Sequence, residues 1–292
     1  MPIRLVATDL DGTLLNSQRQ VSATTRAALA AAAARGVQFV AVTGRRVHSA
    51  RPLLEQVPCP LTLIASNGAV VISPSGEVIH QDFLPRQVAR EVLQAAPAHR
   101  PYAVLIFYSP DAGQIVVQQD AVAEGPLGWY LEHSPRAVQM VPNLELALAT
   151  DPVQVMFGGP PAVIEPVEVI LRDSPTGAKV HLTWTKYFTR NISLLDVMNH
   201  TCSKGRALRL WAERCGIEAS EIMAVGDNYN DLEMLEFAGL PVLMANASPG
   251  LARDGWAVTR SNDEDGVAAA IETYVLRGEL WGGTVSAANA NS

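Results

Sequence analysis

The chain has 292 residues, of which 48% are hydrophobic and 17% charged, which is enough for a large apolar core and favours two domains. Its formal net charge of −7 disfavours a nucleic-acid or anionic-membrane surface as partner. The sequence has no apolar run near the roughly 20 residues of a membrane-spanning helix, so we expect neither nucleic acid nor membrane among the partners.

The positions of the cysteines and histidines bear on the cellular compartment and on the kind of metal site to expect. Cys59, Cys202 and Cys215 form an odd and scattered set, which indicates a reducing compartment. The first four residues lead directly into a strand-like run without a signal-like segment, and the six histidines are too scattered to predict a zinc cluster. We therefore expect a cytoplasmic protein, and both a monomer and a small homo-oligomer are compatible with the sequence.

Strands and helices alternate over the first part of the chain. An apolar run that ends in Asp9 predicts a buried strand, and Ser22 is a suitable N-cap for an alanine-rich helix that Gly36 ends. The next predicted elements are a strand over 37–42, a helix over 47–56 and a strand over 61–65. This β-α-β-α-β order predicts a parallel sheet with right-handed crossovers.

The pattern then becomes rich in strands. A hairpin over 69–72 and 78–81 comes first, and residues 84–192 predict an inserted α+β domain. Within this insert we predict helices over 86–96 and 161–172, strands over 103–107, 114–119, 153–157 and 178–183, and an irregular segment over 125–142. A strand over 192–197 follows at the end of the insert.

Helix–strand alternation returns after the insert. The predicted elements are a helix over 203–215, a strand over 222–225, a helix over 232–237, a strand over 241–244 and a helix over 265–276. The chain is thus predicted to be an α/β protein whose Rossmann-like parallel-sheet core, residues 1–83 and 193–278, is interrupted by the inserted α+β domain. Residues 279–292 are small and polar, and we expect them to form a frayed tail.

Polar residues follow the ends of the first three core strands. Asp9 and Asp11 follow the first strand, Thr43 the second and Asn67 the third. The carboxyl ends of parallel strands lie along one edge of a sheet, where ligands bind. Two carboxylates about 4 Å apart repel each other by roughly 4 kcal/mol at an effective dielectric near 20, which a cation or a proton relieves. For Asp-x-Asp-Gly alone, solvated turn aspartates are the alternative interpretation.

The groups that this edge would gather favour phosphate chemistry. They are Asp9, Asp11, Thr43, Lys204, Asp227, Asn230 and Asp231. Carboxylates without cysteine or histidine favour a hard cation, most simply Mg2+, and a lysine with a threonine hydroxyl suits a phosphate group. The sequence lacks P-loop, dinucleotide-binding and Gly-x-Ser-x-Gly patterns. Hydrolysis of a phosphate monoester then fits, with one carboxylate as nucleophile and a second as general acid and base.

Four sequence blocks carry a family resemblance. In chain order they are Asp9-Leu10-Asp11-Gly12-Thr13-Leu14-Leu15, Thr43-Gly44-Arg45, Ser203-Lys204-Gly205-Arg206-Ala207-Leu208 and Gly226-Asp227-Asn228-Tyr229-Asn230-Asp231. They resemble the four motifs of the haloacid dehalogenase superfamily of phosphatases, in its Cof-like branch with a C2-type cap. The resemblance covers the whole core and implies that the inserted α+β domain is this cap.

The resemblance also implies catalytic and metal-binding roles. Asp9 would be the nucleophile and Asp11 the general acid and base. Mg2+ would be bound by the carboxylates of Asp9 and Asp227 and by the backbone carbonyl of Asp11. Asp231 would lie close by and support the metal site and the catalytic lysine.

A further set of residues would contact the phosphate or the substrate. Thr43 and Lys204 would hold the phosphoryl oxygens and so count among the catalytic residues, and Asn230 would contact the phosphate. Arg45 and Asn67 are open to two interpretations, because they would either line the substrate pocket or only connect loops. The full predicted set of phosphate and substrate contacts is Thr43, Gly44, Arg45, Asn67, Lys204 and Asn230.

These expectations converge on a Mg2+-dependent phosphatase that hydrolyses a small phosphorylated metabolite through an aspartyl-phosphate intermediate. A sugar phosphate and a phosphorylated cofactor precursor are the substrate classes considered, since a cap of over 100 residues would restrict the site to small molecules. One alternative is a phosphotransferase or phosphomutase acting on sugar phosphates. A non-catalytic metabolite-binding module is a second alternative, but it would be expected to lack Asp9 or Lys204, and both are present.

Overall fold

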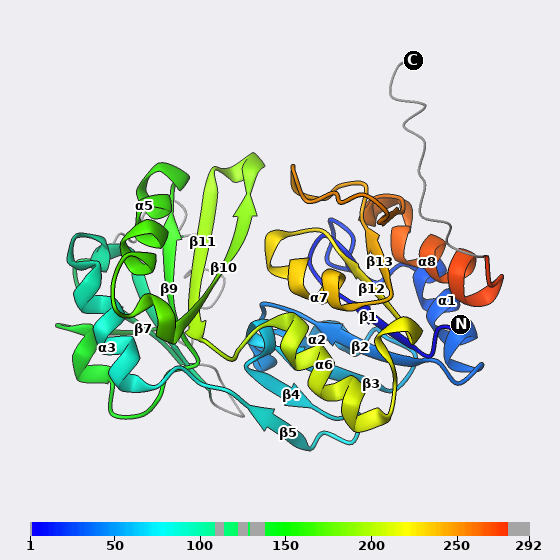
Figure 1. Cartoon of the computed structure of the whole chain (residues 1–292), viewed down its shortest axis with the longest axis horizontal. Helices are drawn as coiled ribbons and strands as arrows, with labels where there is room; N and C mark the ends of the chain where they lie inside the picture. Colours follow the sequence, from blue (N-terminus) through cyan, green and yellow to red (C-terminus); the bar gives the residue numbers. More distant parts are fainter. Residues whose placement is uncertain (1, 109–113, 122–127, 129–137, 280–292) are drawn as a thin grey trace, which may run out of the picture.

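The computed structural model describes residues 2–108, 114–121, 128 and 138–279. Over these residues the chain forms an eight-stranded and a six-stranded sheet, each with helices packed against it (Figure 1). The two sheets lie side by side, and the larger one contains strands from both the first and the last part of the described chain. None of the helices in the described part has the length and hydropathy of a membrane-spanning helix.

The eight-stranded sheet has a parallel body with an antiparallel edge. Its strands, in spatial order, are β14 (Ala257–Val258), β13 (Leu240–Leu243), β12 (Ile222–Gly226), β1 (Leu5–Thr8), β2 (Gln38–Val42), β3 (Leu61–Ala65), β4 (Val70–Ile72) and β5 (Val78–Gln81). The strands from β14 to β3 run parallel, whereas β4 and β5 are antiparallel to their neighbours. The strand order reverses direction between β1 and β12, which makes this pair the topological switch point where ligands of such sheets bind.

Helices on both faces explain why the core strands are continuous apolar runs. The helices α1 (Ala23–Ala33), α2 (Val47–Leu54) and α8 (Gly266–Ala270) cover one face, and α6 (Lys204–Cys215) and α7 (Leu232–Phe237) cover the other. Within β1, Val6 packs with the first group of helices, while Leu5 and Ala7 pack with the second. Both faces of the strand are therefore buried, and its polar functional groups can appear only where it ends.

The six-stranded sheet is antiparallel except for one strand pair. Its spatial order is β10 (Val180–Tyr187), β11 (Ile192–Asn199), β9 (Gln154–Gly159), β6 (Ala103–Phe107), β7 (Gln114–Gln118) and β8 (Val138–Val141). The helices α3 (Arg86–Ala95) and α5 (Pro161–Arg172) pack on one face, against side chains such as Phe157 and Leu195. Met156 and Leu194 lie on the opposite face, in an apolar cluster that continues into the eight-stranded sheet.

The predicted α/β fold with a parallel core sheet is confirmed, and three of the strands that differ from the prediction bear on the site. β10 extends to Tyr187 instead of ending at residue 183, and β8 lies inside the segment predicted to be irregular. β11 continues to Asn199 instead of ending at residue 197, and it pairs with β10 and β9. Hydrophobic periodicity identifies a strand but not the sheet that it joins, so cross-strand partners decided these points.

Some predictions concern residues outside the described ranges. The rest of the predicted irregular segment includes 125–127 and 129–137, which lie outside the described residues, as do residues 280–292 of the predicted tail. The domain division at 83/84 and 192/193 stays a prediction. The short strand β14, only two residues long, was not predicted because so short a run carries no periodicity.

Candidate active site

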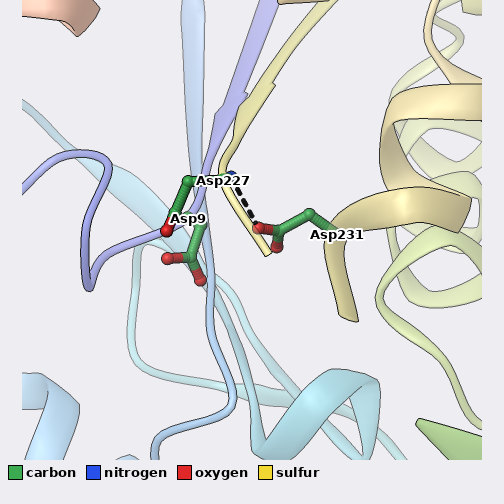
Figure 2. Close-up of side chains that lie close together, drawn as sticks. All are labelled: Asp9, Asp227 and Asp231. Atoms are coloured by element: carbon green, nitrogen blue, oxygen red, sulfur yellow. Dashed lines mark hydrogen bonds between the residues drawn. The ribbon is translucent and has the colours of Figure 1, made fainter. Parts of the chain in front are cut away.

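Three buried aspartates gather at the switch point of the core sheet. Asp9 follows β1 and Asp227 follows β12, and these strands are hydrogen-bonded neighbours in which Thr8 faces Val225. Asp231 comes from the turn that leads into α7. Figure 2 shows the three carboxylates turned towards one another, and each offers an oxygen within 4.8 Å of the others.

Lys204 joins two of these aspartates. It is the first residue of α6, and its buried ammonium donates to Oδ1 of Asp9 and to Oδ1 of Asp231, each at 2.6 Å. Ser203 caps the helix by accepting from the backbone N–H of Arg206 at 3.2 Å. A cation at a helix N-terminus is unfavourable by itself. Burial lowers the pKa of Lys204, but the adjacent charges of Asp231 and Asp9 outweigh burial and raise it overall.

Asp231 holds the loop that carries Asp227. Its Oδ2 accepts from the backbone N–H of Asp227 at 2.9 Å, the contact dashed in Figure 2, and from that of Asn228 at 3.0 Å. Its Oδ1 accepts from Lys204. Both carboxylate oxygens therefore already bind protein donors, which suits the supporting role predicted for Asp231.

Asp227 is held from the other side by the loop after β1. Thr13 donates its hydroxyl to Oδ1 of Asp227 at 2.7 Å. Gly12 has a φ of +83°, and a Cβ added there would lie 2.5 Å from Oδ2 of Asp227. The glycine therefore allows both the left-handed backbone and the close approach of the carboxylate. Burial, followed by the charges of Asp9 and Asp231, raises the pKa of Asp227 well above its ordinary value.

We expect the substitution Gly12→Ala to displace the Asp227 carboxylate. Gly76→Ala is the matched control, since Gly76 has a similar φ of +87° but has no neighbour within 4 Å of the added Cβ. Both variants carry the cost of the left-handed backbone, so the difference between their melting temperatures and activities isolates the contact with Asp227. We expect Gly12→Ala to be the less active by about tenfold or more, and equal activities would contradict this prediction.

The three clustered aspartates carry more formal negative charge than Lys204 can balance. Burial raises the pKa of Asp9 to about 7, with further contributions from Asp231 and Asp11, while Lys204 lowers it. Three buried carboxylates next to one ammonium leave an excess that a divalent cation would offset. All candidate ligand atoms of the cluster are carboxylate oxygens, which suit Mg2+. The residues present therefore fit the predicted cation.

Asp11 and Arg45 form a bidentate ion pair at the mouth of the site. Arg45 donates from Nε to Oδ2 of Asp11 at 2.5 Å and from Nη2 to Oδ1 at 2.6 Å. The two side chains are 24% and 38% exposed, so the pair borders the solvent-accessible side of the cluster. Thr43 is buried beside it, and its hydroxyl accepts from the backbone N–H of Arg45 at 3.1 Å. Arg45 thus contacts the predicted acid and base rather than only connecting loops.

Asn67 links the sheet edge to the six-stranded sheet. It has a φ of +52° in the turn after β3. Its amide donates to Oδ2 of Asp196 at 2.8 Å, and its Oδ1 accepts from Asn230 at 3.0 Å. Gly44 lies against both amides, since a Cβ there would be 3.0 Å from Oδ1 of Asn67 and 3.5 Å from Nδ2 of Asn230. The second partner of Asp196 is Gln154, which donates to Oδ1.

A cavity of about 720 Å³ is lined by all but three of the predicted site residues. Asp9, Asp11, Thr43, Gly44, Arg45, Asp227 and Asn230 line it, together with residues from β9, β10 and β11. The other three residues hydrogen-bond to residues that line the cavity: Lys204 to Asp9, Asn67 to Asn230 and Asp231 to Asp227. The sequence analysis did not single out Gln154 or Asp196, which also line the cavity. The signal available for Asp196 was a single charged residue within the mostly apolar run 192–197.

The chain is similar to known proteins over most of its length. Residues 6–271 match the model of a family described as haloacid dehalogenase-like hydrolase. The chain is similar to the "Putative phosphatase YxeH" of Bacillus subtilis, with 32% identity over 94% of this chain and 98% of that protein. It is 27% identical to the "5-amino-6-(5-phospho-D-ribitylamino)uracil phosphatase YwtE" of Bacillus subtilis, over 92% of this chain and 97% of that protein. A solved haloacid dehalogenase-like hydrolase from B. subtilis superimposes with a TM-score of 0.77 at 26% identity, covering 92% of this chain and 99% of that one.

Proposed function

Because this chain belongs to the haloacid dehalogenase-like hydrolase family and is a phosphatase like its named relatives, we propose that it hydrolyses a small phosphorylated metabolite with Mg2+, through an aspartyl phosphate on Asp9. The observation that carries the proposal is the buried Asp9 at the switch point, within 2.6 Å of the Lys204 ammonium and beside Asp227. This arrangement supports the proposal, because it brings together a carboxylate that can act as nucleophile, an ammonium that can bind a phosphate group and a second carboxylate at one end of the sheet.

Asp9 would act as the nucleophile. A carboxylate oxygen of Asp9 forms a bond to phosphorus while the bond between phosphorus and the ester oxygen breaks. The backbone of Lys204 is fixed at the start of α6, and its ammonium orients the Asp9 carboxylate by donating a hydrogen bond to it. Lys204 and the hydroxyl of Thr43 then hold the phosphoryl oxygens and offset their charge.

Asp11 would move the protons of both steps. In its acid form it gives a proton to the departing ester oxygen, and as a carboxylate it then takes a proton from the water that hydrolyses the aspartyl phosphate. Phosphate leaves and Asp9 is regenerated. Arg45 binds both oxygens of Asp11 in this structure. If one of these contacts opens when the substrate binds, the freed nitrogen of Arg45 can bind a phosphoryl oxygen.

The carboxylates of Asp9 and Asp227, together with the backbone carbonyl of Asp11, would hold the metal ion. When bound, Mg2+ supplies positive charge that offsets the phosphoryl group and the clustered aspartates. Asp231 and Thr13 keep Asp227 in place through the hydrogen bonds described above. The proposed substrate is a sugar phosphate or a phosphorylated cofactor precursor, which the size of the cavity and the name of the relative YwtE both support.

Phosphate release from a panel of small phosphate esters, with Mg2+ and after chelation, tests this proposal. We expect release to require Mg2+ and to return when Mg2+ is added back. The variant Asp227→Asn should raise the Mg2+ concentration for half-maximal activity by about 10- to 100-fold. Asp173→Asn, which changes an exposed carboxylate at the end of α5, is the control and should need no more Mg2+ than the wild type. Undiminished release after chelation would refute the metal assignment.

A further inference from the structure

The second face of the six-stranded sheet, defined as the face opposite α3 and α5, contributes the cavity wall across from the catalytic aspartates. Its register places Asp196 opposite Thr183 of β10 and Met156 of β9. Asp196, Gln154, Met156 and Leu194 all line the cavity from this face. The wall therefore combines apolar side chains with polar ones, and one of the polar groups is a buried carboxylate.

Asp196 is a preformed acceptor site. It is 5% exposed, its Oδ1 accepts from Gln154, and its Oδ2 accepts from Asn67 at 2.8 Å. An ionised carboxylate has about four lone-pair sites, so two protein donors leave capacity for a ligand. Burial raises the pKa of Asp196 to about 7, although the two hydrogen bonds oppose this shift. Additional donors from a ligand would stabilise its charged form.

We propose that Asp196 is a specificity-determining residue that accepts hydrogen bonds from hydroxyl or amino groups on the leaving group of the substrate. This inference rests on the proposed function, because it assumes that the phosphoryl group lies between Asp9 and Lys204. The opposite wall then meets the rest of the ester. Met156 and Leu194 provide an apolar surface beside the acceptor, so the wall suits a compact sugar, polyol or aminated ring.

The same contacts would also fit a purely structural role for Asp196. The experiment therefore has to distinguish that role from recognition of the leaving group. Asp196 binds Asn67, and Asn67 binds Asn230 next to the catalytic edge. If Asp196 only held the two sheets together, its loss would slow every ester alike. If it recognises the leaving group, its loss slows only those esters that carry hydrogen-bond donors.

The test compares glucose 6-phosphate and ribose 5-phosphate with cyclohexylmethyl phosphate, a hydroxyl-free ester of hexose size. We expect the wild type to prefer a hydroxylated ester. The variant Asp196→Asn should lower kcat/KM for that ester by about 10- to 100-fold, mainly through KM, and change kcat/KM for cyclohexylmethyl phosphate by less than about twofold. The variant Gln154→Leu should act in the same direction but less strongly, because it removes a donor that orients Asp196.

Asp82→Asn is the matched control. The carboxylate of Asp82 also accepts two side-chain donors, from Asn199 at 2.6 Å and Thr201 at 2.7 Å, but it does not line the cavity. We expect kcat/KM of this variant to equal that of the wild type for both classes of ester. Parallel losses on both classes in Asp196→Asn and Gln154→Leu would overturn the specificity role, as would unchanged kinetics on the hydroxylated esters or a wild-type preference for cyclohexylmethyl phosphate. If the wild type released phosphate from no ester, the proposed function itself would fail and the inference with it.

Discussion

The substitution Asp9→Asn is expected to lower phosphate release by at least about a thousandfold, because an amide cannot replace the attacking carboxylate. The variant keeps the size of the side chain and removes one of the buried carboxylates around Lys204. Asp231 still pairs with the lysine at 2.6 Å. We therefore expect the fold to persist, with a melting temperature within about 5 °C of the wild type.

A rapid-quench experiment with labelled ester separates loss of the nucleophile from a general loss of activity. The wild type should yield acid-stable labelled protein during turnover, and Asp9→Asn should yield none while still binding the ester. Asp173→Asn serves as the control for a remote aspartate. Retention of more than a tenth of the wild-type rate, or labelling of the Asp9→Asn protein, would show that another group attacks phosphorus.

The substitution Lys204→Met should affect both stability and activity. The lysine side chain is fully buried and paired with two buried aspartates. Removing it leaves Asp9 and Asp231 without their counter-charge, which typically costs about 3–5 kcal/mol of unfolding free energy. The phosphoryl group also loses one of the cations that would offset its charge, so we expect phosphate release to fall by about a hundredfold or more in the protein that remains folded.

Urea unfolding and phosphate release, measured on the same preparations, check this prediction. Lys179→Met is the matched control, because Lys179 pairs with Glu91 at 2.8 Å on a solvent-exposed surface. Exposed pairs contribute less than about 1 kcal/mol, so the control should keep nearly all of its stability and activity. If Lys204→Met were as stable as Lys179→Met, burial of the two aspartates would not depend on the positive charge of Lys204.

The sequence by itself determined the class of the fold and the positions at which polar residues interrupt it. β3 and α7 span the residues predicted for them, and Ser22 caps α1 by accepting from Thr25 at 3.0 Å. These predictions succeeded because they depend on local features. Strands covered on both faces are continuous apolar runs, and caps act within one helical turn. The ends of such runs identified Asp9 and Asp227 as candidates.

Tertiary structure alone decided how those candidates contact one another. The ion pair of Arg45 with Asp11 joins residues 34 positions apart, and the hydrogen bond from Asn67 to Asp196 spans 129 positions. Neither partner could be read from a local pattern, because a hydrophobic period shows which face of an element is buried but not what covers it. The same limit applied to β11, whose pairing in the six-stranded sheet brings Asp196 into the cavity.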